Sequence, residues 1–273
     1  MCAGVPAPQR AGAQGAEGAG RKIPLLISDH HGDHALWLYR LAGREKTDMI
    51  LLDAHGDAAR NPHYRAIRES LARNPAEADG LIGNHNWIHP LSPAPIASLL
   101  WISKLSQAPD PPRVRGFLGS AASWGLENAA CINLNELPFS GPVDGSANLF
   151  VSIDLDFFYA EDYTPRQVPG VFDKLWEYSL GRTGRVLWAL CLSRAWLPGD
   201  HYAWDLLEQS LRWLIPRAEF EAPEISLFSS PRRDTSRKAE AFRAEGMEPP
   251  GFYRREDAMP NSIRDLLQQL QAR

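Results

Sequence analysis

Short apolar runs alternate with amphipathic helical patterns along most of this chain, and this alternation restricts the fold more than any other feature. Several segments between the runs place apolar residues three or four positions apart, as amphipathic helices do. The expected strands are residues 23–27, 49–52, 99–103, 149–153, 186–192 and 225–228, and the expected helices are 34–41, 64–72, 171–180, 202–214 and 262–270. Strands that alternate with helices predict an α/β fold: a three-layer arrangement with a mostly parallel central sheet and helices on both faces.

The chain is long enough for one large α/β domain or two small ones, and we expect one, covering residues 23–273. Residues 1–22 are rich in Ala and Gly without a continuous apolar stretch, so we expect a disordered tail there and no signal peptide or membrane anchor. The Pro-rich stretches 90–95 and 109–112 are expected to be loops, and the charged segment 231–255 an irregular excursion.

Charge and cysteine content exclude some classes of protein. The formal net charge is -4, so the chain has no basic surplus for nucleic-acid phosphates, and we expect no nucleic-acid partner. Its three cysteines, Cys2, Cys131 and Cys191, are far apart and odd in number, which argues against a disulfide framework or a zinc ribbon. A reducing, cytoplasmic location fits this pattern, and oligomeric state cannot be inferred.

Two acidic motifs directly follow apolar runs. Asp53, His55 and Asp57 come after residues 49–52, and in an extended chain they share one face. Asp154 and Asp156 follow the run 149–153 in the same way. Because ligands of open α/β sheets bind outside the carboxyl ends of the strands, we expect these groups to meet in one pocket.

A metal centre explains this cluster of carboxylate side chains. Four carboxylates cannot all stay ionised so close together unless a cation is present. Carboxylates with a minority of imidazole suit Mn²⁺ better than Zn²⁺, and so many ligands suit two ions about 3.5 to 4 Å apart. The run after residues 23–27 contains His30, His31 and His34, any of which is a source of a further imidazole ligand.

The two motifs resemble a known superfamily. Asp53-Ala54-His55-Gly56-Asp57 is similar to the Asp-Ala-His-x-Asp signature of arginases and agmatinases, and Ser152-Ile153-Asp154-Leu155-Asp156 to their Ser-x-Asp-x-Asp signature, in the same order. A closer resemblance is to an arginase-related family that reads Asp-His, Asp-x-His-x-Asp, Asn-Trp-Ile and Asp-Ile-Asp-Leu-Asp-Phe-Phe. This chain has Asp29-His30, Asn86-Trp87-Ile88 and the segment 153–158 in those places.

The resemblance implies an arginase-like fold and a metal-dependent hydrolase of C–N bonds in linear amidines. Bacterial members of the closer family include peptide arginases, which convert arginine of ribosomally made precursor peptides into ornithine and release urea. The implied cofactor is two Mn²⁺ ions, and the implied partner is an arginine-containing precursor peptide. The implied metal ligands are His30, Asp53, His55, Asp57, Asp154 and Asp156.

Two catalytic roles follow from the same resemblance. Asp57 would also orient the attacking hydroxide, and His85, in a stretch similar to the arginase Gly-Asn-x-His, would protonate the leaving amine. The choice among the histidines stays open: an ungapped match to the arginase Gly-Gly-Asp-His stretch favours His31. We retain His30 because the closer family has only Asp-His at this place.

The chain also departs from the arginase pattern. Tyr159 stands where arginases place a third Asp, and no clear counterpart exists for the carboxylate that binds the guanidinium. Asp200 is our candidate for that role, with Glu161 and Asp162 as alternatives, because each could pair with a guanidinium in bidentate fashion.

Other interpretations remain. Asp and His after strands are often only turn formers or helix caps, although five at two-residue spacing are hard to explain that way. A deacetylase-like amidohydrolase is one rival, since His30-His31-Gly32-Asp33 superficially resembles a deacetylase string, but such an enzyme needs one metal. A metal-containing protein that binds a peptide without turnover is the other.

Overall fold

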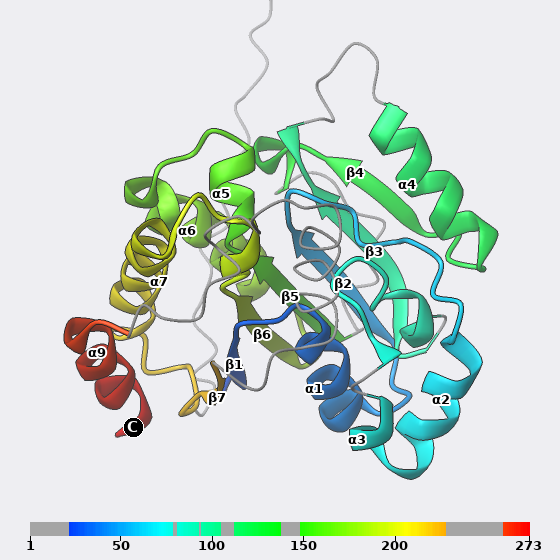
Figure 1. Cartoon of the computed structure of the whole chain (residues 1–273), viewed down its shortest axis with the longest axis horizontal. Helices are drawn as coiled ribbons and strands as arrows, with labels where there is room; N and C mark the ends of the chain where they lie inside the picture. Colours follow the sequence, from blue (N-terminus) through cyan, green and yellow to red (C-terminus); the bar gives the residue numbers. More distant parts are fainter. Residues whose placement is uncertain (1–21, 79–80, 93, 105–111, 138–147, 228–258) are drawn as a thin grey trace, which may run out of the picture.

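The described strands all belong to one parallel sheet (Figure 1). The computed structural model describes residues 22–78, 81–92, 94–104, 112–137, 148–227 and 259–273. Within them, seven strands lie in the order β4-β3-β2-β5-β6-β1-β7, and each neighbouring pair is parallel. The strands are β1 (Leu25–Ser28), β2 (Thr47–Leu52), β3 (Ile96–Ile102), β4 (Ala129–Ile132), β5 (Asn148–Asp154), β6 (Val186–Cys191) and β7 (Glu224–Ser226).

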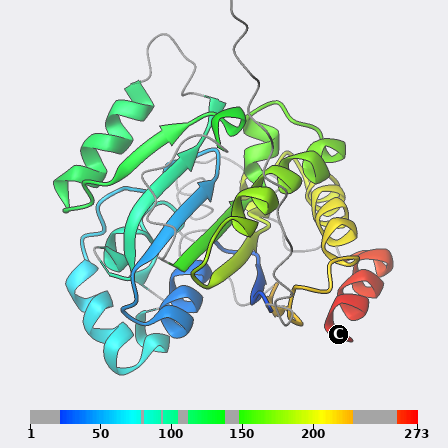
Figure 2. The ribbon, with the colours of Figure 1, turned by 180° about the vertical axis from the view of Figure 1, so that it is seen from behind.

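Helices cover both faces of this sheet, which gives three layers (Figure 1, Figure 2). The helices of the first face are α6 (Val168–Leu180), α7 (Asp200–Leu214) and α9 (Asn261–Gln271); those of the second are α1 (Gly32–Ala42), α2 (Tyr64–Arg73), α3 (Pro75–Ala78) and α4 (Pro112–Ser123). Successive strand residues point to opposite faces, so each interior strand serves both cores. Ile50 and Leu52 of β2 pack with the first set of helices, whereas Met49 and Leu51 pack with the second.

Aromatic side chains dominate the first core. Trp188 of β6 is fully buried and stacks on Trp213 of α7 with ring centroids 5.6 Å apart, and Phe172 of α6 packs edge-on against both rings. Aromatic pairs of this kind contribute about 0.5–1.5 kcal/mol beyond their buried area. They fix the helical layer on β6, the strand beside β5.

The chain reverses its direction across the sheet between β2 and β5. From β2 the chain continues to β3 and β4 on one side, and from β5 it continues to β6 on the other. Leu52 pairs with Ile153, so the two acidic motifs leave adjacent strands at the same level. A reversal of this kind opens a crevice at the carboxyl ends of the strands, which is where open α/β sheets bind ligands.

The structure confirms the expected α/β architecture, with four additions. The expected strands and helices are present with shifted ends, and β4, α3, α4 and the short helix α5 (Asp156–Ala160) lie where no element is expected. The Pro-rich stretch 109–112 was expected to be a loop, but α4 begins at Pro112 because proline is tolerated in the first turn of a helix. The irregular segment 231–255 and all but the last residue of the expected tail lie outside the described residues.

A search of the described helices for membrane spans finds none that is long and apolar enough to cross a bilayer.

Candidate metal centre and pocket

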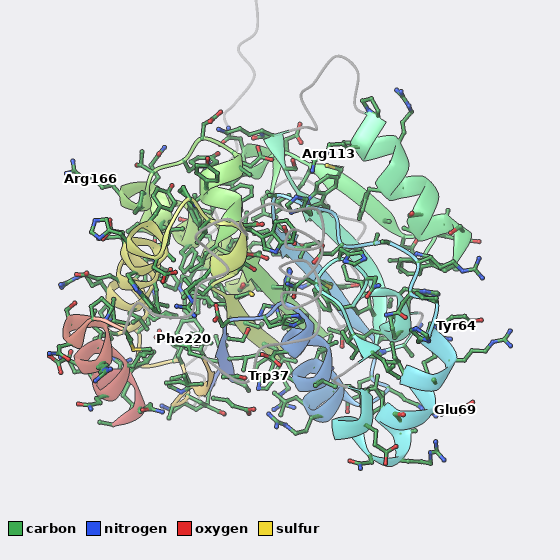
Figure 3. All side chains as sticks on the ribbon, in the orientation of Figure 1. Trp37, Tyr64, Glu69, Arg113, Arg166 and Phe220 are labelled. Carbon is green, nitrogen blue, oxygen red and sulfur yellow. The ribbon has the colours of Figure 1, made fainter. Side chains whose placement is uncertain are left out.

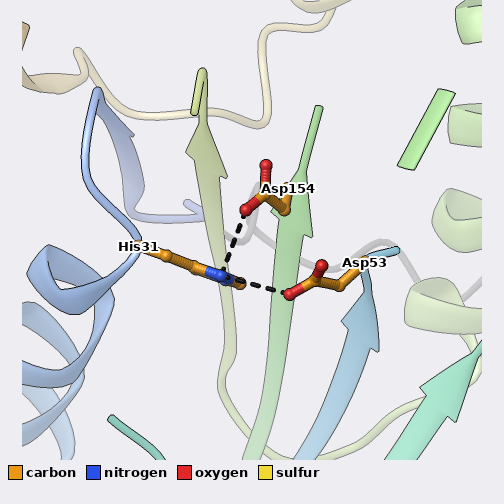
Figure 4. Close-up of side chains that lie close together, drawn as sticks. All are labelled: His31, Asp53 and Asp154. Atoms are coloured by element: carbon orange, nitrogen blue, oxygen red, sulfur yellow. Dashed lines mark ion pairs between the residues drawn. The ribbon is translucent and has the colours of Figure 1, made fainter. Parts of the chain in front are cut away.

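Two groups of ligand-type side chains meet at the end of β2 and share one aspartate. His31, Asp53 and Asp154 form the first group, and Asp53, His55 and Asp156 form the second; within each, one ligand atom per residue lies within 4.8 Å of the others. Figure 4 shows the first group, in which residues from three separate segments converge. Two three-residue groups that share one carboxylate are the arrangement expected for a pair of neighbouring cations.

His31 lies at the centre of the first group. Its Nδ1 is 3.2 Å from Asp53 Oδ2, 2.9 Å from Asp57 Oδ2 and 3.3 Å from Asp154 Oδ2, and its side chain is almost fully buried. Asp57 therefore belongs with the first group. His55 occupies the corresponding place in the second, with Nδ1 3.7 Å from Asp53 Oδ1 and 3.5 Å from Asp156 Oδ2.

The structure brings His31, and not the expected ligand His30, into the two groups of ligand-type side chains. The His30 ring is turned back toward its own backbone, where Nδ1 accepts a hydrogen bond from the Gly32 N–H at 3.1 Å. His34 lies behind His31, with Nδ1 2.8 Å from Ser152 Oγ. His31 immediately precedes α1, and this position directs its ring to the carboxylates. The other five expected ligands lie together in the two groups.

Buried atoms at the centre of the cluster lack hydrogen bonds. His31 Nδ1 and Asp53 Oδ2 make none in the described structure, although both are inaccessible to water. The two atoms face each other at 3.2 Å without a well-formed hydrogen bond, and a bound cation would coordinate both. Four carboxylates with two imidazoles are also a donor set that manganese accepts, so the residues fit a pair of divalent ions.

The pKa shifts within the cluster also fit a bound cation. Burial and then the neighbouring Asp53 raise the pKa of Asp57 to about 7, and burial and then Asp156 raise the pKa of Asp154 well above its ordinary range. Hydrogen bonding to Asp156 and then to Asp53 raises the pKa of His55 to about 10. The cluster thus holds extra protons when no metal is bound, and divalent cations would replace them.

A second set of side chains holds the ligands in place. Trp87 is fully buried, and its Nε1 donates a 2.7 Å hydrogen bond to Asp57 Oδ2. Ser193 Oγ donates to Asp154 Oδ2 at 2.7 Å, and His31 Nε2 lies 2.9 Å from Ser152 Oγ. A hydrogen bond to one ring nitrogen leaves the other free for a metal, so Ser152 orients His31 Nδ1 toward the carboxylates.

Backbone strain is concentrated at this site. Of the described residues other than glycine, three have a positive φ: Asp57 at 44°, Ser193 at 45° and Asp162 at 55°. Asp57 is a ligand-type residue and Ser193 hydrogen-bonds to another. Residues with side chains rarely adopt this conformation, and strain of this kind is typical of functional sites.

The cluster forms the floor of a cavity of about 360 Å³, which is large enough for a small molecule or a side chain. His55, which is half exposed, opens toward it, and His85 also lines it from an exposed position. The wall opposite the strands comes from α4, which contributes Arg113 and Phe117 among others. The expected proton donor therefore has access to the cavity.

The candidate guanidinium ligands do not line the cavity. Asp200 Oδ2 lies 3.7 Å from Arg194 Nη1, in a network that also joins Arg194 to Asp29. Glu161 is buried and accepts hydrogen bonds from Ser103 Oγ and the Lys104 N–H. The substrate role of Asp200 is therefore not supported, because its carboxylate is engaged with an arginine outside the cavity, and exposed Asp162 is not among the lining residues either.

Sequence reasoning gave no role to several residues of the site. Trp87 enters the sequence analysis only through the Asn-Trp-Ile resemblance, although its place two residues after the candidate acid His85 is an available signal. Ser193, Phe117 and Trp196 carried no signal, because they reach the site through tertiary packing.

Comparison with known proteins gives no family assignment. No protein-family model matches the chain. A search of curated proteins finds no match either.

Proposed function

We propose that this protein is a binuclear manganese-dependent hydrolase that converts peptidyl arginine to ornithine and releases urea. One observation carries the proposal: buried Asp53 is shared between two ligand groups that each contain one histidine. A one-metal amidohydrolase needs neither the second histidine nor the extra carboxylates, so this geometry supports the ureohydrolase reading over the deacetylase-like one.

The residues at the cavity have distinct tasks in this reaction. When bound, a pair of divalent cations would lower the pKa of water and stabilise the negative charge that develops on the attacking oxygen. Asp57, held by Trp87, accepts a hydrogen bond from the attacking water and orients it. The oxygen bonds to the guanidinium carbon, and the bond from that carbon to the side-chain nitrogen then breaks. Both protons of the attacking water end on that nitrogen: Asp57 takes one and passes it on, and His85 supplies the other and recovers a proton from the carbon-bound oxygen, so the products are urea and the ornithine ammonium group.

An arginine on a peptide suits the position of the cavity. His55 is 48% exposed and Trp196 is 39% exposed, so one side of the metal cluster faces solvent. A long side chain can enter from that side while the peptide backbone remains outside. The exposed indole of Trp196, whose ring centroid is 6.0 Å from that of His55, offers an apolar surface beside the entrance.

The test is urea release from arginine-containing peptides, agmatine and free arginine by the manganese-loaded protein. Asp154→Ala should abolish release, because it removes a buried member of the cluster. Asp265→Ala is the matched control, since Asp265 is exposed on α9 and should leave release unchanged. Ornithine in the peptide product, detected by mass spectrometry, would identify the peptide reaction.

Negative results would separate the alternatives. Two bound metal ions without urea from any substrate would reject arginine hydrolysis and leave hydrolysis of another amide, or binding of a peptide without turnover. One bound ion with deacetylation of an acyl-lysine peptide would favour the deacetylase-like reading instead.

A further inference from the structure

The cavity carries one positively charged side chain that the metal chemistry does not use. Arg113 lies in the first turn of α4 (Figure 3). It is one of the residues that line the cavity. Among the described lining residues it is the single Lys or Arg. No hydrogen bond or ion pair joins it to another described residue.

The carboxylates of the cavity are already committed to other partners. All four acidic side chains that line it belong to the metal cluster. Asp57 accepts from Trp87, Asp154 accepts from Ser193, and Asp156 faces His55. Two divalent cations would balance these four negative charges, so Arg113 remains without a counter-charge among the described lining residues.

The positive charge of Arg113 affects which substrate the cavity can accept. A guanidinium group that enters the cavity meets no described carboxylate outside the metal cluster, and it meets a like charge on Arg113. Like charges near one another repel, and the repulsion is removed when an anion lies between them. A substrate that brings its own carboxylate beside the guanidinium would satisfy both cations.

One face of α4 around Arg113 lines the cavity and leaves room for a ligand. Arg113, Gly116, Phe117 and Ser120 are spaced three, four and seven residues along α4, so they share one helix face, and all four line the cavity. Gly116 has open space around the position of a side chain, which leaves room beside Arg113. The planar guanidinium of an arginine binds a carboxylate through two parallel hydrogen bonds.

We propose that Arg113 forms a carboxylate-binding subsite, so that the preferred substrate is an arginine with a carboxylate close to it. This inference rests on the proposed function and specifies its substrate class. The carboxylate has two sources, the side chain of an acidic neighbouring residue in a peptide or the carboxyl group of the arginine itself.

Four peptides distinguish these sources. The neutral reference is Ac-Ala-Arg-Ala-NH2, and the acidic ones are Ac-Asp-Arg-Ala-NH2, Ac-Ala-Arg-Asp-NH2 and Ac-Ala-Arg with a free carboxyl end. They are compared with the wild-type protein, Arg113→Gln and Arg115→Gln, all loaded with manganese. Arg115 is the matched control because it lies on the same helix, is exposed and does not line the cavity.

At least one acidic peptide should exceed the neutral one about tenfold in kcat/KM, mainly through a lower KM, which corresponds to one charge-assisted hydrogen bond at a partly exposed site. Arg113→Gln should abolish this preference, and Arg115→Gln should keep it. The peptide that gains most identifies the source of the carboxylate. Equal kcat/KM for all four peptides in the wild type, or a preference that survives Arg113→Gln, would overturn the inference.

Binding measured by calorimetry keeps the inference separate from the proposed function. If no peptide yields urea, the proposed reaction fails, but tighter binding of an acidic peptide that disappears in Arg113→Gln still supports the subsite. Binding that does not depend on Arg113 would reject the subsite even if every peptide yields urea.

Discussion

His31→Ala should remove one metal-binding position, because the His31 ring lies among three carboxylates. His30→Ala should leave both positions, because the His30 ring accepts a hydrogen bond from the Gly32 N–H instead. Loss of a residue that only supports a ligand weakens metal affinity by about 10–100-fold, so loss of a direct ligand should cost at least 100-fold.

The loss of stability expected for His31→Ala follows from the linkage between metal binding and folding. At a free Mn²⁺ concentration of about 100 times the dissociation constant, binding at one site stabilises the fold by about 2.7 kcal/mol. If affinity falls 100-fold, only about 0.4 kcal/mol of this remains. A loss of about 2 kcal/mol lowers the midpoint of thermal unfolding by roughly 4–8 °C in a chain of this size.

The assay is thermal unfolding with and without Mn²⁺, combined with metal content after dialysis. His31→Ala should lose part of the increase in Tm that manganese produces, and should retain about one ion per chain. His30→Ala removes a buried hydrogen bond, so its free energy of unfolding should fall by about 1 kcal/mol. Its Tm should therefore fall by the same amount with and without metal. If His30→Ala loses the manganese-dependent increase while His31→Ala keeps it, the assignment is wrong.

The remaining predictions concern the supports of the site and its pH dependence. Trp87→Phe keeps an aromatic ring but removes the hydrogen bond to Asp57, so metal affinity should fall about 10–100-fold in a manganese titration; Trp188→Phe is the control, because its Nε1 makes no hydrogen bond within the described structure. Gly56→Ala would place a methyl group 2.5 Å from Phe117 Cδ2, so it should cost about 1–3 kcal/mol in unfolding and raise KM with metal content unchanged; an unaltered KM would contradict the described shape of the cavity. The pKa of Asp57 rises from 3.8 to about 7 in the folded, metal-free protein, so the folded state binds more protons than the unfolded one and metal-free stability should fall as the pH rises across that interval. Manganese must displace those protons, so its affinity should rise over the same interval; an affinity independent of pH in titrations at about pH 5 and about pH 7 would count against protonated carboxyls in the cluster.

The sheet and most of the candidate metal ligands could be predicted from sequence because both depend on local patterns. A buried strand has a continuous apolar run, and the residues that follow it leave the sheet at its carboxyl edge. Asp53 and Asp154 are therefore placed by the strands that precede them, and the register of β2 and β5 brings them together.

The position of His31 could not be predicted with the same security. It lies in a loop before α1, where no periodicity specifies which of two consecutive rings turns inward. The answer depends on contacts with Ser152 and the carboxylates, which are more than 20 residues away in sequence. A resemblance to a short motif was the only signal, and it supported both choices.

The far wall of the cavity could not be predicted from the sequence. Its helix α4 begins at a proline, contains two glycines and has only Phe117 and Ala121 buried, so its pattern is weak. The cavity depends on how this helix packs on the sheet, and Arg113 and Phe117 are about 60 residues from Asp53. The proposed carboxylate-binding subsite therefore rests on the three-dimensional arrangement and not on a sequence pattern.

The central claim is a pair of metal ions that share Asp53. The most direct test is a crystal structure of the manganese-loaded protein with data collected at the manganese absorption edge. The account predicts two anomalous peaks about 3.5–4 Å apart, one beside His31 and one beside His55, with Asp53 contacting both. A single peak, or peaks away from these residues, would contradict it.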